Sequence, residues 1–81
     1  MGGLLKCLRF SMHMETHIEF VVYDVLGRKV KVLEDGMREA GAHEVVWDGK
    51  DEKGAGVGSG MYFYQVKMGE DVKKGKMVLV R

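Results

Sequence analysis

The sequence has no proline, a single cysteine and no long apolar run. Without proline, the chain is neither a proline-rich linker nor a collagen-like repeat. Cys7 cannot form an internal disulfide, so cysteine usage leaves the compartment open. The longest stretch without a formal charge is Gly54–Val66, which is too short and too rich in glycine to cross a membrane. Lys6 and Arg9 interrupt the apolar residues near the N-terminus, so we expect no export signal in these residues.

An excess of charge of one sign is also missing. Thirteen Lys and Arg stand against twelve Asp and Glu, for a net charge of +1. This balance lacks the basic footprint of nucleic-acid binders, so we expect no nucleic-acid partner and no membrane insertion. What is present is an 81-residue chain that is 46% hydrophobic and 31% charged, with twelve glycines. These values are typical of one small folded domain with many turns.

Short runs rich in β-branched and aromatic residues recur between glycine-bearing turns, and no window keeps a helical period. The runs predict strands at residues 8–12, 17–24, 28–33, 43–48, 61–68 and 72–80, with a seventh short strand near Val57. Glu34–Gly36 is predicted to end the third strand, and Met37–Gly41 to form a connection with at most one helical turn. The pattern predicts an all-β fold, a small antiparallel β-sandwich of six to seven strands.

Two turns and a core follow from the same pattern. Asp24–Gly27 fits a type I turn with a glycine bulge, because Asp can accept a backbone hydrogen bond and Gly tolerates a positive φ. Gly69–Asp71 fits a hairpin turn. Alternation along the strands predicts that most of the core comes from ten residues: Ile18, Phe20, Val22, Val30, Val32, Val45, Trp47, Tyr62, Tyr64 and Val66.

Candidate metal ligands are arranged unfavourably. His13 and His17 are four residues apart, which would place both rings on one face of a helix, but they lie between two strand patterns. Glu15 stands one position too late for a zinc-protease motif. In the acidic segment that begins at Asp48, Lys50 occupies a position where an EF-hand needs an oxygen ligand. We therefore predict no metal site.

Signals for a cofactor or a catalytic group are equally weak. The glycine-rich segment Gly54–Gly60 precedes a strand, whereas a phosphate-binding loop opens a helix. Cys7 has no supporting pattern for a nucleophile, and no Ser-His-Asp order stands out. We predict no cofactor and no catalytic residue, so the domain is expected not to be an enzyme.

Two features leave alternatives open. Trp47, Tyr62 and Tyr64 could line a carbohydrate-binding face, although their strand periodicity favours the core. Lys73, Lys74 and Lys76 could form a docking patch that faces solvent along the last strand. They could also simply protect an edge strand, because lysine discourages pairing with other chains.

Several motifs occur together in an order that resembles one bacterial family. Phe20–Val30 reads FVVYDVLGRKV, which is similar to a VYDxLGRxV hairpin. A strand ending in Val46-Trp47-Asp48-Gly49 follows, then Ser59–Tyr64, and the chain closes with Lys76–Arg81. The sequence resembles the immunoglobulin-like domain of FlgD type and the similar C-terminal sorting domain of the type IX (Por) secretion system. The resemblance covers residues 8–81, and residues 1–7 are an extension unlike the family.

The resemblance implies an immunoglobulin-like sandwich and a non-enzymatic role. In sorting domains the module is the signal that the outer-membrane translocon recognises, and this is our main prediction, with an extracellular or cell-surface location. The alternatives are an assembly module like the flagellar hook scaffold and a small carbohydrate-binding module. The expected partners are therefore proteins, either the translocon or assembly partners. Carried over by position, Gly60 and Tyr62 match the Gly-x-Tyr strand of the family, and together with the three lysines they are the predicted partner-recognition residues.

Overall fold

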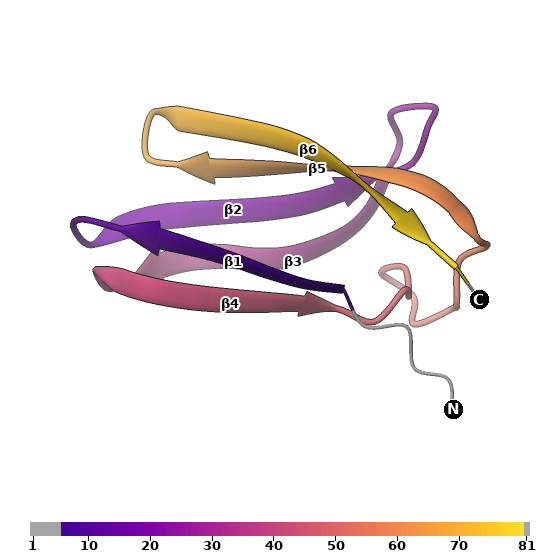
Figure 1. Cartoon of the computed structure of the whole chain (residues 1–81), viewed down its shortest axis with the longest axis horizontal. Helices are drawn as coiled ribbons and strands as arrows, with labels where there is room; N and C mark the ends of the chain where they lie inside the picture. Colours follow the sequence, from indigo (N-terminus) through magenta and orange to yellow (C-terminus); the bar gives the residue numbers. More distant parts are fainter. Residues whose placement is uncertain (1–5, 81) are drawn as a thin grey trace.

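The computed structural model describes residues 6–80, which form six β-strands joined by turns (Figure 1). The strands are β1 (Lys6–Met12), β2 (Thr16–Tyr23), β3 (Lys29–Arg38), β4 (Gly41–Trp47), β5 (Gly60–Met68) and β6 (Asp71–Leu79). No helix long and apolar enough to cross a membrane occurs among these residues.

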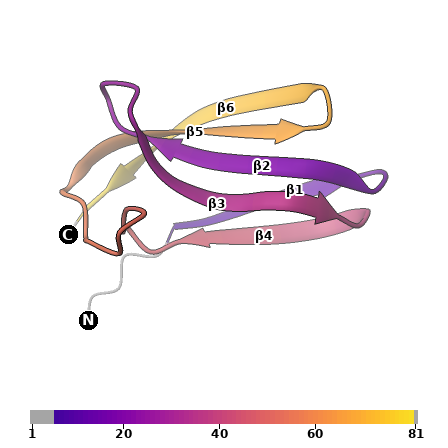
Figure 2. The ribbon, with the colours of Figure 1, turned by 180° about the vertical axis from the view of Figure 1, so that it is seen from behind.

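All strand pairs are antiparallel, and they form two sheets of unequal width. β1 pairs with β4, while the larger sheet has the order β3-β2-β5-β6. Figure 1 shows β1 and β4 in front of β3, and Figure 2 shows the larger sheet from behind. The predicted all-β, immunoglobulin-like sandwich is confirmed. Because β2 and β5 are the inner strands of the larger sheet, β3 and β6 are its two edges.

The core consists of two clusters between the sheets. One contains Val22, Val30, Trp47, Tyr62 and Leu79, and the other contains Ile18, Phe20, Val45 and Val66. Each cluster contains one buried side chain from β4, and Leu8, Phe10 and Met12 of β1 also pack against the second cluster, so both strands of the small sheet contact the larger sheet. Eight of the ten predicted core residues are buried, and Tyr64 is half-buried against the second cluster.

The largest fully buried side chain, Trp47, joins the two sheets to the loop between β4 and β5. Its indole N–H donates to the carbonyl of Lys50 at 2.9 Å. Its ring packs edge-to-face against the Tyr62 ring, with 5.2 Å between the ring centroids. The Tyr62 hydroxyl donates to the carbonyl of Gly58 at 2.7 Å. Both aromatic side chains thus bury their apolar area while their polar atoms stay hydrogen-bonded, which avoids the cost of an unpaired buried donor.

The prediction that Val32 faces the core is wrong. The pairing of β2 with β3 shifts between Phe20 and Val21 and again between Val22 and Tyr23. Each shift inserts one extra β3 residue, as a β-bulge does, so the alternation along β3 is broken. Leu33, the residue inserted at the first shift, packs against both core clusters in place of Val32.

β3 is also longer than predicted. Glu34–Gly36 does not end the strand, and Met37–Gly41 contains no helical turn, because β3 continues to Arg38 in register with Thr16. The turn-forming preference of Glu34–Gly36 is overridden by the ladder that β2 supplies on one side. No seventh strand occurs within residues 6–80, and the loop before Val57 contains only an isolated bridge between Lys50 and Gly56.

Both predicted turns are present. The Asp24 carboxylate accepts the N–H groups of Leu26 and Arg28 at 2.9 Å, and Gly27 N–H donates to the Asp24 carbonyl. Gly27 has a φ of 82°, which favours glycine. The hydrogen bond from the Arg28 backbone, together with the other donors, lowers the pKa of the Asp24 carboxyl below its ordinary value. At the other hairpin, Gly69 and Glu70 separate β5 from β6.

Position 75 in β6 requires glycine because the Tyr64 side chain lies very close to its backbone. It pairs with Tyr64, whose ring lies directly over it, so a Cβ at this position would be only 2.3 Å from ring atoms of Tyr64. The Tyr64 ring also contacts Phe20, with 5.5 Å between the ring centroids. The absence of a side chain at Gly75 is therefore what lets Tyr64 reach the second core cluster.

Replacing Trp47 with alanine should lower the free energy of unfolding by about 3–5 kcal/mol, because it leaves a large cavity between the sheets. Urea denaturation followed by circular dichroism measures the loss. The matched control is Val46→Ala in the same strand, whose side chain is 47% exposed. That change should cost no more than about 0.5 kcal/mol. Equal losses in the two variants would contradict the assigned core.

Replacing Gly75 with alanine should destabilise the domain by about 1–3 kcal/mol, because the new methyl group forces the Tyr64 ring aside. Gly58→Ala is the control, since a Cβ there meets nothing within 4 Å. In a double-mutant cycle with Tyr64→Leu, the Gly75→Ala change should cost much less than it does in the wild-type background. Additive losses would show that the ring and the glycine do not interact.

Candidate protein-docking surface

All five predicted recognition residues lie on the β5–β6 hairpin, but their side chains have different surroundings. Gly60 is exposed at the start of β5. Tyr62 is only 9% exposed and contacts Trp47, so a partner of the folded domain has little access to it. The three lysines on β6 are exposed.

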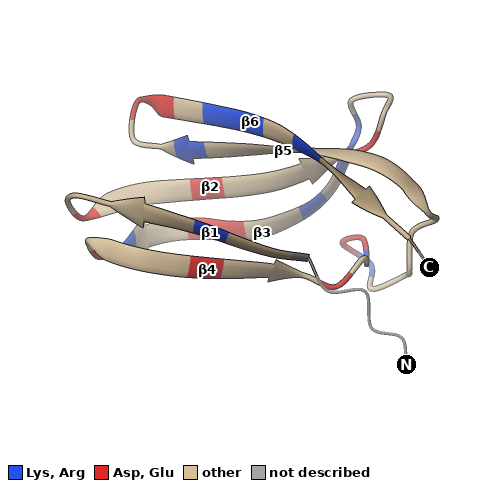
Figure 3. Ribbon diagram, in the orientation of Figure 1, with Lys and Arg blue, Asp and Glu red and all other residues tan. Residues whose placement is uncertain are grey.

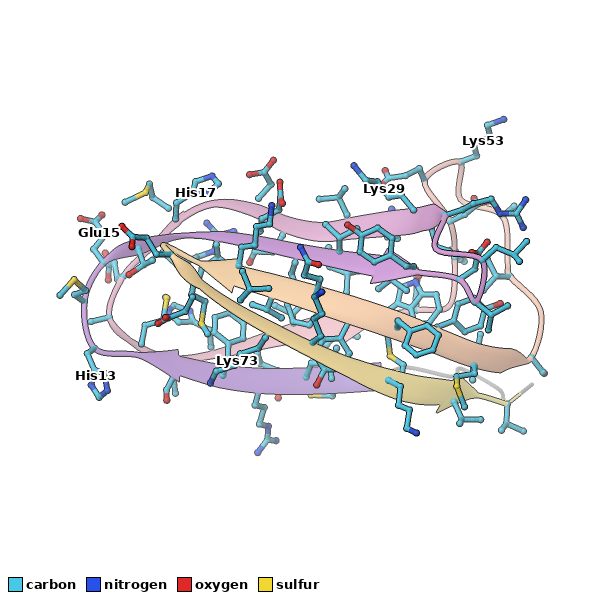
Figure 4. The ribbon with its side chains drawn as sticks, turned by 90° about the horizontal axis from the view of Figure 1, so that it is seen from above. His13, Glu15, His17, Lys29, Lys53 and Lys73 are labelled. Carbon is cyan, nitrogen blue, oxygen red and sulfur yellow. The ribbon has the colours of Figure 1, made fainter. Side chains whose placement is uncertain are left out.

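The three lysines face solvent, but they do not share one face of β6. Successive side chains of a strand point to opposite sides, so Lys73 lies on the face of Gly75, and Lys74 and Lys76 lie on the other. Lys73 borders a groove of about 250 Å³ together with Leu8 and Phe10 of β1. Figure 4 shows Lys73 beside β1, on the side of the molecule away from Lys29.

Lys74 and Lys76 stand on the outer face of the four-stranded sheet, which points away from β1 and β4. Residues paired across antiparallel strands share a face, so the register identifies their neighbours. One row across the sheet reads Lys29, Tyr23, Phe63 and Lys76. The next row reads Val32, Val21, Gln65 and Lys74. Tyr23 and Phe63 therefore share the outer face, with lysines on both edges of the sheet.

A hollow of about 470 Å³ lies on this part of the molecule. Its walls are the β2–β3 turn, through Val25 and Gly27, and the sheet, through Tyr23, Phe63 and Lys74. The Asp24 carboxylate, which fixes the turn, also borders the hollow. Figure 2 shows that the loop between β2 and β3 projects beyond the strands, and the hollow lies between this loop and the sheet.

The charges on the outer face are distributed unevenly. At the end nearer the β5–β6 turn, Lys67 Nζ lies 3.8 Å from Glu19 Oε1, and His17 Nε2 lies 3.1 Å from Asp35 Oδ1. At the end nearer the β2–β3 turn, Lys29, Lys74 and Lys76 have no ion-pair partner among the residues that the structure describes. The charge colouring of Figure 3 shows this contrast along β6, where acidic residues occur only at the hairpin end.

β6 also has an open edge. It pairs with β5 on one side, and within residues 6–80 no strand pairs with its other side. Most of its residues are exposed, including Val72 and Val78 at 50% each. By contrast, the other edge strand of the same sheet is partly covered: the Glu52 carboxylate accepts the N–H of Val32, and Glu52 N–H donates to the carbonyl of Val30.

The other candidate residues of the sequence are not brought together. Figure 4 shows His13 and His17 on opposite sides of the β1–β2 connection, with Glu15 between them. In the acidic loop, Asp48 and Asp51 accept backbone N–H groups of their own turns. Residues 6–80 contain no group of three or more His, Cys, Asp or Glu side chains placed to hold a metal.

Cys7 is exposed on β1 beside Arg9 and Glu44. The hydrogen bond to the Glu44 carboxylate is the main cause that raises the pKa of the thiol above its ordinary value. A raised pKa keeps the thiol protonated at neutral pH, which disfavours nucleophilic chemistry.

The alternative of a carbohydrate-binding face formed by Trp47, Tyr62 and Tyr64 does not fit the structure, and their favoured placement in the core does. Such a face needs at least two of its three aromatic side chains exposed, but Trp47 is fully buried, Tyr62 is 9% exposed and Tyr64 is half-buried. The accessible aromatic side chains lie elsewhere, at the exposed Phe63 and the half-buried Tyr23. The sequence analysis did not single out these two residues, although the strand phase of Phe63, opposite to that of Tyr62 and Tyr64, could have identified it.

Comparison with known proteins places these features in a family. The profile of the FlgD Ig-like domain matches residues 10–71. Among solved structures, FlgD from P. aeruginosa is similar, with a TM-score of 0.70 and 24% sequence identity. That match covers 93% of this chain and 59% of the FlgD chain, so the domain spans little more than half of that protein. No curated protein matches the chain.

The family match covers the β2–β3 hairpin with its Asp24–Gly27 turn, the Trp47 strand and β5, and it ends at Asp71, the first residue of β6. These motifs also carry the resemblance in the sequence, whereas the closing segment Lys76–Arg81 lies beyond the match. The chain therefore belongs to the FlgD Ig-like domain family.

Proposed function

We propose that this domain is a non-enzymatic assembly module of the hook-scaffold type, which joins proteins through the β5–β6 side of its larger sheet. The observation that carries the proposal is the family match together with the open edge of β6. An open edge presents unpaired N–H and C=O groups, which a partner can engage by adding a strand. The cell surface or extracellular space remains our proposed location.

The arrangement of the surface supports protein binding over a chemical reaction. The exposed apolar residues of β6, Val72 and Val78, flank Lys74 and Lys76 on a strand whose outer edge no described segment pairs with. Protein interfaces combine an apolar centre with polar and charged groups around it, and the mixture of valines and lysines on β6 has this composition. The raised thiol pKa at Cys7 and the dispersed histidines offer no competing catalytic group.

A sorting signal for the type IX translocon is a second use of the same strand, and it stays a prediction. The open edge of β6 favours it, because a translocon can engage an open edge strand in the same way as an assembly partner. Lys74 and Lys76 would then contribute to recognition with little effect on stability. The two uses differ in the partner that contacts β6.

Photo-crosslinking in the native bacterium distinguishes them. Benzoylphenylalanine introduced at Val72 or Val78 should form adducts with a hook or other assembly subunit, identified by mass spectrometry, because both side chains are half exposed on β6. The control position is Val46 on β4, which has similar exposure and should yield far less adduct.

An adduct with an outer-membrane translocon component would support sorting instead. Adducts of equal yield at all three positions, or none at β6, would contradict a docking role for this side of the sheet.

A further inference from the structure

The outer face of the larger sheet has two ends with different electrostatics. At one end, the Glu19 carboxylate lies close to the Lys67 ammonium group, and the Asp35 carboxylate lies 3.1 Å from the His17 ring nitrogen. At the other end, three lysines on the two edges of the sheet flank the exposed Phe63 and the half-buried Tyr23, and no carboxylate of residues 6–80 lies within ion-pair distance of these lysines. We define the basic aromatic surface as Tyr23, Lys29, Phe63, Gln65, Lys74 and Lys76.

The proposed function requires a protein contact, and the chemistry of this surface specifies its kind. We propose that the basic aromatic surface binds an acidic, extended segment of the partner protein, whose carboxylates contact the lysines and whose apolar side chain enters the hollow beside Phe63. This inference rests on the proposed function and adds the class of ligand and the residues that select it.

Charge complementarity identifies the occupant. Unpaired ammonium groups that frame apolar rings attract carboxylates, and the rings supply area for an apolar or aromatic side chain. Phe63 is 38% exposed, which is unusual for a phenylalanine, and it lies next to Tyr23 in the register. A hollow of about 470 Å³ accommodates one large side chain.

The register also gives the spacing of the acidic groups. Lys29 on β3 and Lys76 on β6 are the ends of one row, three strand intervals or about 14 Å apart. An extended peptide crosses that distance in about four residues. The surface should therefore prefer carboxylates about four residues apart with an apolar residue between them.

A second copy of the chain is a poorer occupant, because a symmetric contact through this surface would bring lysines against lysines. An anionic membrane also suits lysines beside apolar groups, and Val25 and Leu26 at the adjacent turn are exposed. The hollow beside Phe63, which accommodates a single side chain, favours a peptide over a membrane, and the membrane is an outcome of the test.

The experiment selects ligands without assuming their sequence. A display library of 12-residue peptides is panned against the full chain, and enriched peptides are measured by fluorescence anisotropy. Enriched sequences should carry carboxylates on both sides of an apolar residue. Their affinity should fall when the salt concentration is raised from about 0.05 M to about 0.5 M.

Variants localise the site. Lys74→Ser with Lys76→Ser should weaken the selected peptides about five- to tenfold, and Phe63→Ser about tenfold or more. The matched controls are Lys73→Ser, on the other face of β6, and Lys67→Ser, at the charge-paired end; each should change affinity less than twofold. Affinities are compared only for variants whose melting temperature equals that of the wild type. If Phe63→Ser lowers the melting temperature, Phe63→Leu is used in its place.

Three results would overturn the inference: enriched peptides without acidic residues, equal weakening by Lys73→Ser, or tighter binding to phosphatidylglycerol vesicles than to any selected peptide. Its failure is separable from that of the assembly role. Crosslinks from β6 to an assembly subunit without acidic peptide binding would leave the assembly role and remove the basic aromatic surface as its ligand site.

Discussion

The packing of Trp47 against Tyr62 is the contact on which the rest of the fold depends. A sheet of two strands cannot by itself cover a sheet of four, and Trp47 supplies the largest apolar surface between them. Its indole N–H and the Tyr62 hydroxyl are bonded to carbonyls of the loop between β4 and β5. One contact thus links both sheets and orders the glycine-rich loop, whose Glu52 then caps the edge of β3.

The inner face of the larger sheet is buried in the core, and its β3 edge is hydrogen-bonded by Glu52. The β6 edge and the outer face are therefore the parts of this sheet that remain accessible to a partner. β6 keeps an open edge, and the outer face keeps an unpaired set of lysines around Phe63 and Tyr23. Neither feature stabilises the domain: an open edge invites association, and exposed aromatic area gains nothing from folding. A protein partner that binds β6 and the outer face would explain why the domain keeps an open edge and an exposed aromatic side chain.

Much of the fold could be predicted because it is encoded locally. Period-two alternation identifies the core faces of β2, β4 and β5, and Asp24 with Gly27 specifies the turn. The bulges that place Leu33 rather than Val32 in the core depend on the partner strand, so no local pattern reveals them. The basic aromatic surface needs β5 beside β2, a pairing of strands distant in sequence. Strand phase alone separates Lys73 from Lys74 and Lys76, and this distinction could have been drawn from the sequence.

Amide hydrogen exchange followed residue by residue in the free protein tests the central claim most directly, namely that a Trp47-centred core leaves β6 open. The account predicts that amides of β2 and β5 exchange only through global unfolding, whereas alternate amides of β6 exchange much faster because they point away from β5. Slow exchange of every β6 amide, as slow as in β2, would contradict it, since the edge would then be covered without any partner.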